Sequence, residues 1–89
     1  MIIFSGEAEA IDYLKTQDLK NLGVGMRVNG SRTSDGYLYG PWYVTGYLYN
    51  KETLEFPVGD RFKINITWVT REDAEKQISR IRTAIGDEV

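Results

Sequence analysis

Residues 42–49 alternate between two kinds of side chain, and this alternation limits the folds that the chain can adopt. One parity holds the apolar side chains Trp42, Val44 and Leu48. The other parity holds Tyr43, Thr45, Tyr47 and Tyr49. Because successive side chains of a β-strand point to opposite faces, the pattern predicts a strand with one apolar face and one tyrosine-rich face.

Four further segments are predicted as strands. Residues 2–4 form a short apolar run, and residues 24–28, 54–58 and 62–68 repeat the two-residue period. Pro57 cannot donate a hydrogen bond to a neighbouring strand, so the segment 54–58 is expected at a sheet edge or near its end. The predicted apolar face of the sheet comprises Val24, Met26, Val28, Trp42, Val44, Leu48, Phe56, Ile64, Ile66 and Trp68. The predicted opposite face comprises Arg27, Tyr43, Thr45, Tyr47, Tyr49, Glu55, Lys63, Asn65 and Thr67.

Two segments have the apolar spacing of amphipathic helices. The first covers about residues 7–16, with Ser5 as its expected N-cap and glutamates in its first turn. The second covers residues 71–85, with Thr70 as its expected N-cap and Gly86 as its stop. Each helix has one apolar stripe, which must be buried against another element.

These elements predict a single α+β domain over residues 1–89. The simplest arrangement packs both helices on the apolar face of a mainly antiparallel sheet of four or five strands. Antiparallel sheets commonly leave their second face to solvent, so the sheet is expected to be open-faced. The chain is 42% hydrophobic and 27% charged, which is ordinary for a globular protein of this size.

The polar segment 29–36 contains two dipeptides that are typical of hairpin turns, Asn29-Gly30 and Asp35-Gly36. Both turns cannot close long hairpins at once, and the sequence does not decide between them. The segment can be a simple hairpin loop or a binding loop built around Arg32. Tyr37 and Tyr39 precede Gly40-Pro41, where a strand can be interrupted, so their face is left unassigned.

The composition argues against several kinds of chemistry. The chain has no cysteine and no histidine, so it lacks thiolate ligands, disulfides and the usual acid–base residue at neutral pH. Tyr47 and Lys51 have the four-residue spacing of a dehydrogenase proton donor and its lysine, but that geometry requires a helix. No phosphate loop, dinucleotide fingerprint or calcium loop is present. We therefore expect a protein without catalytic residues, metal or cofactor.

The net charge of −2 argues against a global electrostatic grip on duplex nucleic acid. The first ten residues do not have the apolar length of a signal peptide or of a membrane span. We therefore expect a cytoplasmic protein that does not act on membranes.

The tyrosines of the predicted open face are the strongest functional signal. A tyrosine ladder can simply stabilise a sheet, but tyrosine is also enriched at protein interfaces. We expect a small protein-binding module, such as an adaptor, an inhibitor or an accessory subunit, whose partner is another protein or a second copy of this chain. The alternative is a domain that binds single-stranded nucleic acid, such as RNA, by stacking bases on the exposed rings. The candidate partner-binding residues are Arg27, Arg32, Tyr43, Tyr47, Tyr49 and Lys63.

Overall fold

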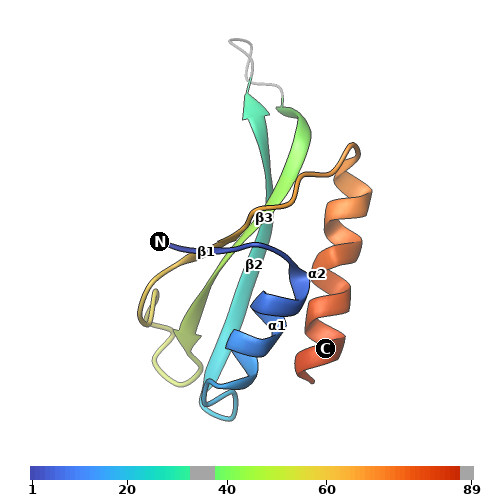
Figure 1. The fold of residues 1–89 in the computed structure, drawn as a ribbon. Helices are drawn as coiled ribbons and strands as arrows, with labels where there is room; N and C mark the ends of the chain where they lie inside the picture. Colours follow the sequence, from blue (N-terminus) through green and yellow to red (C-terminus); the bar gives the residue numbers. More distant parts are fainter. Residues whose placement is uncertain (33–37, 87–89) are drawn as a thin grey trace.

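The protein is described by a computed structural model that covers residues 1–32 and 38–86, and its fold is a sheet with two helices packed against it (Figure 1). The elements follow the order β1 (Ile2–Phe4), α1 (Glu7–Lys15), β2 (Leu22–Arg32), β3 (Leu38–Asn50), β4 (Phe62–Ile64) and α2 (Arg71–Ile85). The four strands form one mixed sheet in the order β1-β4-β3-β2. The α+β class is confirmed, and the described residues form four strands, the lower of the two expected numbers.

The sheet is built around the long antiparallel pair β2–β3. Its register pairs Val24 with Leu48 and Val28 with Val44. β4 continues the antiparallel arrangement on the other side of β3. β1 pairs with β4 in parallel, which the sequence did not predict.

Both helices cover the same face of the sheet. The side chains of Val24, Val44 and Leu48 are buried on this face, as the alternation predicted. Ala10 and Leu14 of α1, together with Ala74 and Ile81 of α2, belong to the same core cluster. The remaining predicted core residues, apart from Phe56, are buried or packed against this cluster: Met26, Val28, Trp42, Ile64, Ile66 and Trp68.

The helix ends agree with the sequence more closely at α2 than at α1. Thr70 caps α2 by accepting a hydrogen bond from the Asp73 amide at 3.2 Å, and Gly86 ends the helix in the left-handed conformation with φ 79°. The N-cap of α1 is Gly6, so the prediction of Ser5 was wrong. The Ser5 amide and hydroxyl instead both donate to the Glu9 carboxylate at 2.7 Å. These bonds to the charged form hold the pKa of Glu9 below its usual value.

The segment 54–58 is not a strand, and Phe56 is not in the core. Asn50 starts a turn in which its side-chain oxygen accepts hydrogen bonds from the amides of Glu52 and Thr53 at 2.9 and 3.0 Å. Leu54 follows with a positive φ of 62°, which strand geometry does not allow. The predicted strand 62–68 is shortened to β4, which ends at Ile64. Beyond β4, Trp68 forms an isolated antiparallel β-bridge with Trp42.

The dipeptide Asn29-Gly30 does not form the hairpin turn. It lies inside β2, where Asn29 pairs with Tyr43 and the register shifts before Ser31. The alternative turn, Asp35-Gly36, and Tyr37 lie outside the described residues. The backbones of Arg32 and Tyr39 belong to β2 and β3, whereas their side chains are not described.

Candidate binding face

The face of the sheet opposite the helices, which we call the open face, is formed mainly by odd-numbered residues. The β2–β3 register pairs Gly23 with Tyr49, Gly25 with Tyr47, Arg27 with Thr45, and Asn29 with Tyr43. On the next strand, Lys63 pairs with Thr45, and beyond it Ile3 pairs with Lys63. One row across four strands therefore reads Ile3, Lys63, Thr45, Arg27.

Two tyrosine rings of the open face lie directly over glycines. A Cβ atom placed on Gly25 would come 2.5 Å from the Cζ atom of Tyr47. A Cβ atom on Gly23 would overlap the ring of Tyr49 in the same way. Glycine weakens a strand because it has no side chain to pack, and an aromatic ring laid across it restores that packing. The sequence pattern Gly-x-Gly opposite Tyr-x-Tyr thus lets both rings lie over the neighbouring strand.

Phe56 joins these tyrosines from the segment between β3 and β4. Its ring centroid lies 5.2 Å from that of Tyr47, and the Tyr47 and Tyr49 centroids are 6.3 Å apart. Phe56 nevertheless remains 59% exposed. The apolar part of the open face is therefore larger than the tyrosines alone.

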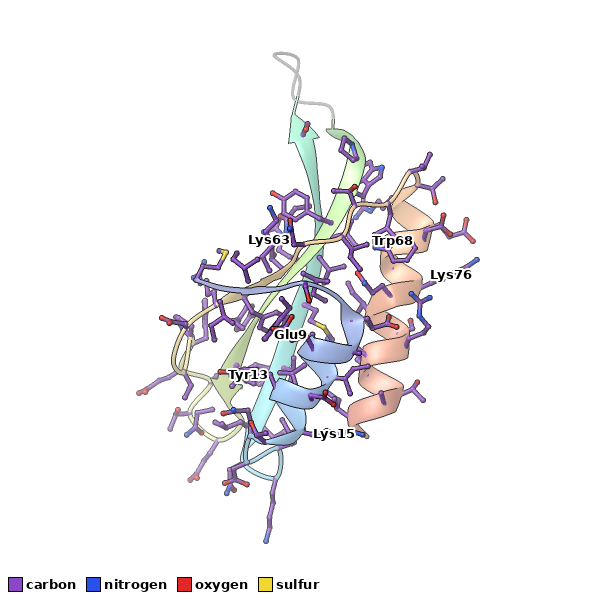
Figure 2. The ribbon with its side chains drawn as sticks, in the orientation of Figure 1. Glu9, Tyr13, Lys15, Lys63, Trp68 and Lys76 are labelled. Atoms are coloured by element: carbon purple, nitrogen blue, oxygen red, sulfur yellow. The ribbon has the colours of Figure 1, made fainter. Side chains whose placement is uncertain are left out.

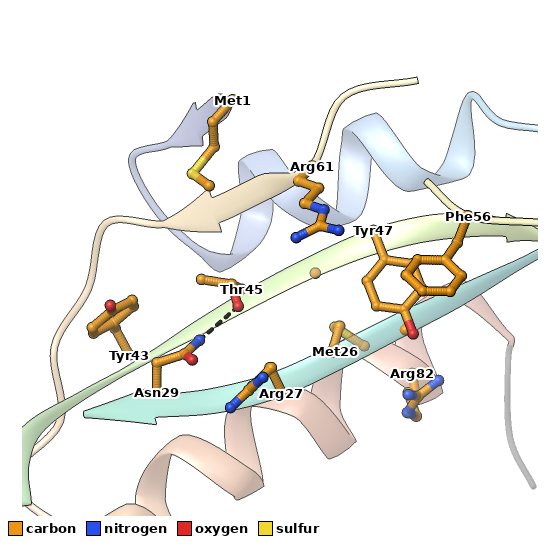
Figure 3. Close-up of a pocket in the computed structure, with 12 residues that line it drawn as sticks. Met1, Met26, Arg27, Asn29, Tyr43, Thr45, Tyr47, Phe56, Arg61 and Arg82 are labelled. Atoms are coloured by element: carbon orange, nitrogen blue, oxygen red, sulfur yellow. Dashed lines mark hydrogen bonds between the residues drawn. The ribbon is translucent and has the colours of Figure 1, made fainter. Parts of the chain in front are cut away.

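Basic side chains lie beside the aromatic ones. The Nζ atom of Lys63 is 4.7 Å from the ring centroid of Tyr43, which is within the range of a cation–π interaction. Arg27 and Arg61 lie on the same face (Figure 3). In the described part of the chain, no carboxylate forms an ion pair with Arg27, Arg61 or Lys63.

Three cations of α2 contrast with those of the open face. Arg71 pairs with Glu75 at 3.3 Å, and Lys76 pairs with Glu72 at 3.8 Å. Arg80 reaches Glu7 of α1 at 3.0 Å. Figure 2 shows Lys63 on the sheet and Lys76 on the outer side of α2. Arg27, Arg61 and Lys63 of the open face therefore differ from these three, because none of them has a described carboxylate within ion-pair distance.

A concavity of about 610 Å³ lies on the open face and reaches the outer edge of β2 (Figure 3). At that edge, the Nη1 atom of Arg82 donates a hydrogen bond to the Val24 carbonyl oxygen at 3.0 Å. Within the concavity, the side-chain Nδ2 atom of Asn29 donates a hydrogen bond to the Thr45 hydroxyl at 2.6 Å. Among residues 1–32 and 38–86, no acidic side chain lines the concavity, and the lining residues are Met1, Gly25, Met26, Arg27, Asn29, Tyr43, Thr45, Gly46, Tyr47, Phe56, Arg61 and Arg82.

The structure brings most of the sequence-predicted residues together. Tyr43, Tyr47 and Arg27 line the concavity. Tyr49 lies next to Tyr47, and Lys63 lies against the Tyr43 ring. Arg32 belongs to β2, but its side chain lies outside the described part of the structure.

Sequence reasoning missed Met1, Phe56 and Arg61. Arg61 precedes Lys63 by two residues, so the two-residue period could have placed it on the same face. Phe56 was missed because the segment 54–58 was read as a strand with this ring on the core side. Met1 had no detectable signal, because its place depends on the parallel pairing of β1 with β4.

The side chains of the open face limit the kinds of ligand that it could hold. Over residues 1–32 and 38–86, no group of three or more potential metal ligands comes together. The polar groups that line the concavity are cationic or neutral, so they can attract and orient an anionic ligand.

Comparison of the chain with protein-family models, with curated proteins and with solved structures finds no match. In the described residues, no helix combines the length and apolar character needed to cross a membrane.

Proposed function

We propose that this protein is a small, non-catalytic binding domain that uses its open face to bind another protein. The observation that carries the proposal is the packing of Tyr47 and Tyr49 on Gly25 and Gly23. Rings that are already held in place lose little conformational freedom when a partner covers them, which favours tight binding. Tyrosine also combines a large apolar area with a hydroxyl group, a combination that is common at interface hot spots.

The exposed apolar groups beside these rings support the same function. Phe56 is 59% exposed and Met1 is 69% exposed. Both line the concavity with Tyr47. Apolar side chains gathered in one hollow and surrounded by polar groups are typical of the centre of a protein interface.

The test is a binding assay with an affinity-purified partner from the native host, using the full chain as bait. Tyr47→Ala is expected to weaken binding by about 2 kcal/mol, the effect of a typical hot-spot residue. Tyr47→Phe retains the ring and should lose much less. Val69→Ala removes an exposed apolar side chain away from the concavity and serves as the matched control.

Two results would contradict the proposal. One is a partner that binds Tyr47→Ala as tightly as the native chain. The other is the absence of both a partner in the affinity purification and self-association of the isolated chain. Sedimentation at increasing concentration measures the self-association.

A second candidate function is the binding of single-stranded nucleic acid. It is favoured by the three cations Arg27, Arg61 and Lys63, which share a face with tyrosines and have no described acidic partner. Labelled oligothymidylate and oligouridylate should then bind, and their affinity should fall as the salt concentration rises. The substitution Tyr43→Ala or Tyr47→Ala should also lower the affinity. Absence of binding at about 50 mM salt would remove this candidate.

A further inference from the structure

Granted the proposed function, we propose that the occupant of the concavity is an acidic polypeptide segment that carries an apolar side chain. The charge of the site is the first argument. Arg27 and Arg61 line the concavity, Lys63 lies beside it, and no acidic residue of the described part of the chain contributes to the lining. A partner with carboxylates at these positions would be electrostatically complementary, whereas a basic partner would be repelled.

The positions of the cations suit the carboxylates of an extended chain. Lys63 and Arg27 flank Thr45 in one cross-strand row, so their Cα atoms are separated by two strand spacings, about 10 Å. Arg61 precedes Lys63 by two residues, a separation of about 7 Å along an extended chain. The guanidinium groups of Arg27 and Arg61 each present a fork that matches a carboxylate.

The apolar corner of the concavity provides the second recognition element. Tyr47 and Phe56 line this corner with ring centroids 5.2 Å apart, and Met1 lines the concavity from the other side (Figure 3). Methionine is flexible and polarisable, so Met1 can adapt to an aromatic or aliphatic side chain of the partner. Burial of such a side chain would supply affinity that charge alone does not give.

The surroundings of the concavity favour a peptide over a nucleic-acid strand. Glu52, Glu55 and Asp60 are exposed in the segment that carries Phe56. A nucleic-acid strand has a negative charge at every phosphate, so it would meet these carboxylates as well as the cations. A peptide can place its carboxylates at the cations and neutral residues elsewhere.

The test uses a fluorescein-labelled synthetic peptide with glutamates around one phenylalanine. One control peptide replaces the glutamates with glutamine, and another replaces the phenylalanine with serine. Fluorescence anisotropy measures the dissociation constant of each peptide, and of oligothymidylate and oligouridylate, for the full chain. The acidic peptide with phenylalanine is expected to bind tightest, and its affinity should fall with salt because it depends on charge.

Two double variants with the same change in charge test the role of the cations. Arg27→Gln with Lys63→Gln is expected to weaken binding of the acidic peptide by about tenfold or more, because two complementary charges are lost. Arg71→Gln with Lys76→Gln changes charges on α2 and is expected to alter binding by less than about twofold. Phe56→Ala tests the apolar corner, and circular dichroism verifies that each variant is folded.

The outcomes distinguish this inference from the proposed function. Equal binding of the glutamine peptide, or equal effects of the two double variants, would overturn the inference. Tighter binding of an oligonucleotide that depends on Arg27 and Lys63 would also overturn it and assign the face to nucleic acid. A native protein partner that depends on Tyr47 but is unaffected by the Arg27→Gln/Lys63→Gln variant would overturn the inference and leave the proposed function standing.

Discussion

On both faces of the sheet, an aromatic ring lies over a glycine of the neighbouring strand. On the core side the ring is Phe62 of β4, and the glycine is its cross-strand partner Gly46. On the open side the ring is Tyr47 of β3, and the glycine is its partner Gly25. The local arrangement is the same, but Phe62 is buried in the core, whereas Tyr47 lies on the face opposite the helices and is partly exposed.

The comparison separates how a ring is positioned from what the ring does. The glycine under each ring lets it lie close to the sheet. Burial then decides whether the ring contributes mainly to stability or remains available to a partner. Charges differ in the same sense, because the cations Arg71, Lys76 and Arg80 of α2 form ion pairs, whereas Arg27 and Lys63 form none within the described structure.

The largest expected difference comes from removing the two rings. Phe62→Ala leaves a cavity in the core and should lower the free energy of unfolding by about 3–5 kcal/mol. Tyr47→Ala removes a partly exposed ring and should cost about 1 kcal/mol or less, the size of a cross-strand contact. Urea denaturation of both variants measures the two values. Equal losses of unfolding free energy would show that Tyr47 stabilises the fold as much as Phe62 does.

A smaller difference is expected from filling the space under each ring. The Cβ atom in Gly46→Ala would collide with Phe62 and would also approach the Gly25 carbonyl oxygen to 2.7 Å. Neither the buried Phe62 ring nor the Gly25 backbone carbonyl can move away easily, so the free energy of unfolding should fall by about 1–3 kcal/mol. In Gly25→Ala the Tyr47 ring can swing toward solvent, so stability should fall by less than about 1 kcal/mol.

The Gly25→Ala variant also tests whether the position of the Tyr47 ring matters for binding, because it moves the ring without replacing the residue. Displacement of the ring should weaken binding to a partner although Tyr47 itself is still present. Urea denaturation and the partner-binding assay, carried out on the same samples, check both expectations. Unchanged binding would indicate that the position of the Tyr47 ring over Gly25 is irrelevant to recognition.

The smallest expected difference concerns the charges. Arg80→Gln breaks the contact of Arg80 with Glu7 and should cost about 0.2–1 kcal/mol, less at high salt. Arg27→Gln removes no described ion pair and should leave the free energy of unfolding unchanged within about 0.5 kcal/mol. Denaturation at low and high salt measures both. A comparable, salt-sensitive loss in Arg27→Gln would reveal that Arg27 has a structural role.

The sequence predicted what depends on local pattern. Residues 42–49 showed which side chains face the core, and Thr70 and Gly86 marked the ends of α2 correctly. In contrast, the parallel pairing of β1 with β4 joins residues that are far apart in the chain, and no local pattern encodes it. Phe56 was placed on the wrong side because period two alone does not reveal the turn that starts at Asn50.

The same limits applied to the candidate site. Tyr43, Tyr47 and Arg27 were found because strand parity assigns them to one face. The packing of the rings on Gly23 and Gly25 was not foreseen, because it requires the register between β2 and β3. That register depends on both strands together, because each must place its apolar side chains on the same face of the sheet.

The parallel pairing of β1 with β4 also affects when the concavity is completed during folding. Its tyrosine side belongs to the β2–β3 hairpin, whose strands are near each other in sequence. Its Met1 and Arg61 side requires the beginning of the chain to meet a strand on the other side of that hairpin. Contacts between distant segments carry a larger entropic cost of closure and form more slowly than local ones. A folding chain that has formed only the hairpin would therefore have the tyrosines in place and lack the opposite wall of the concavity.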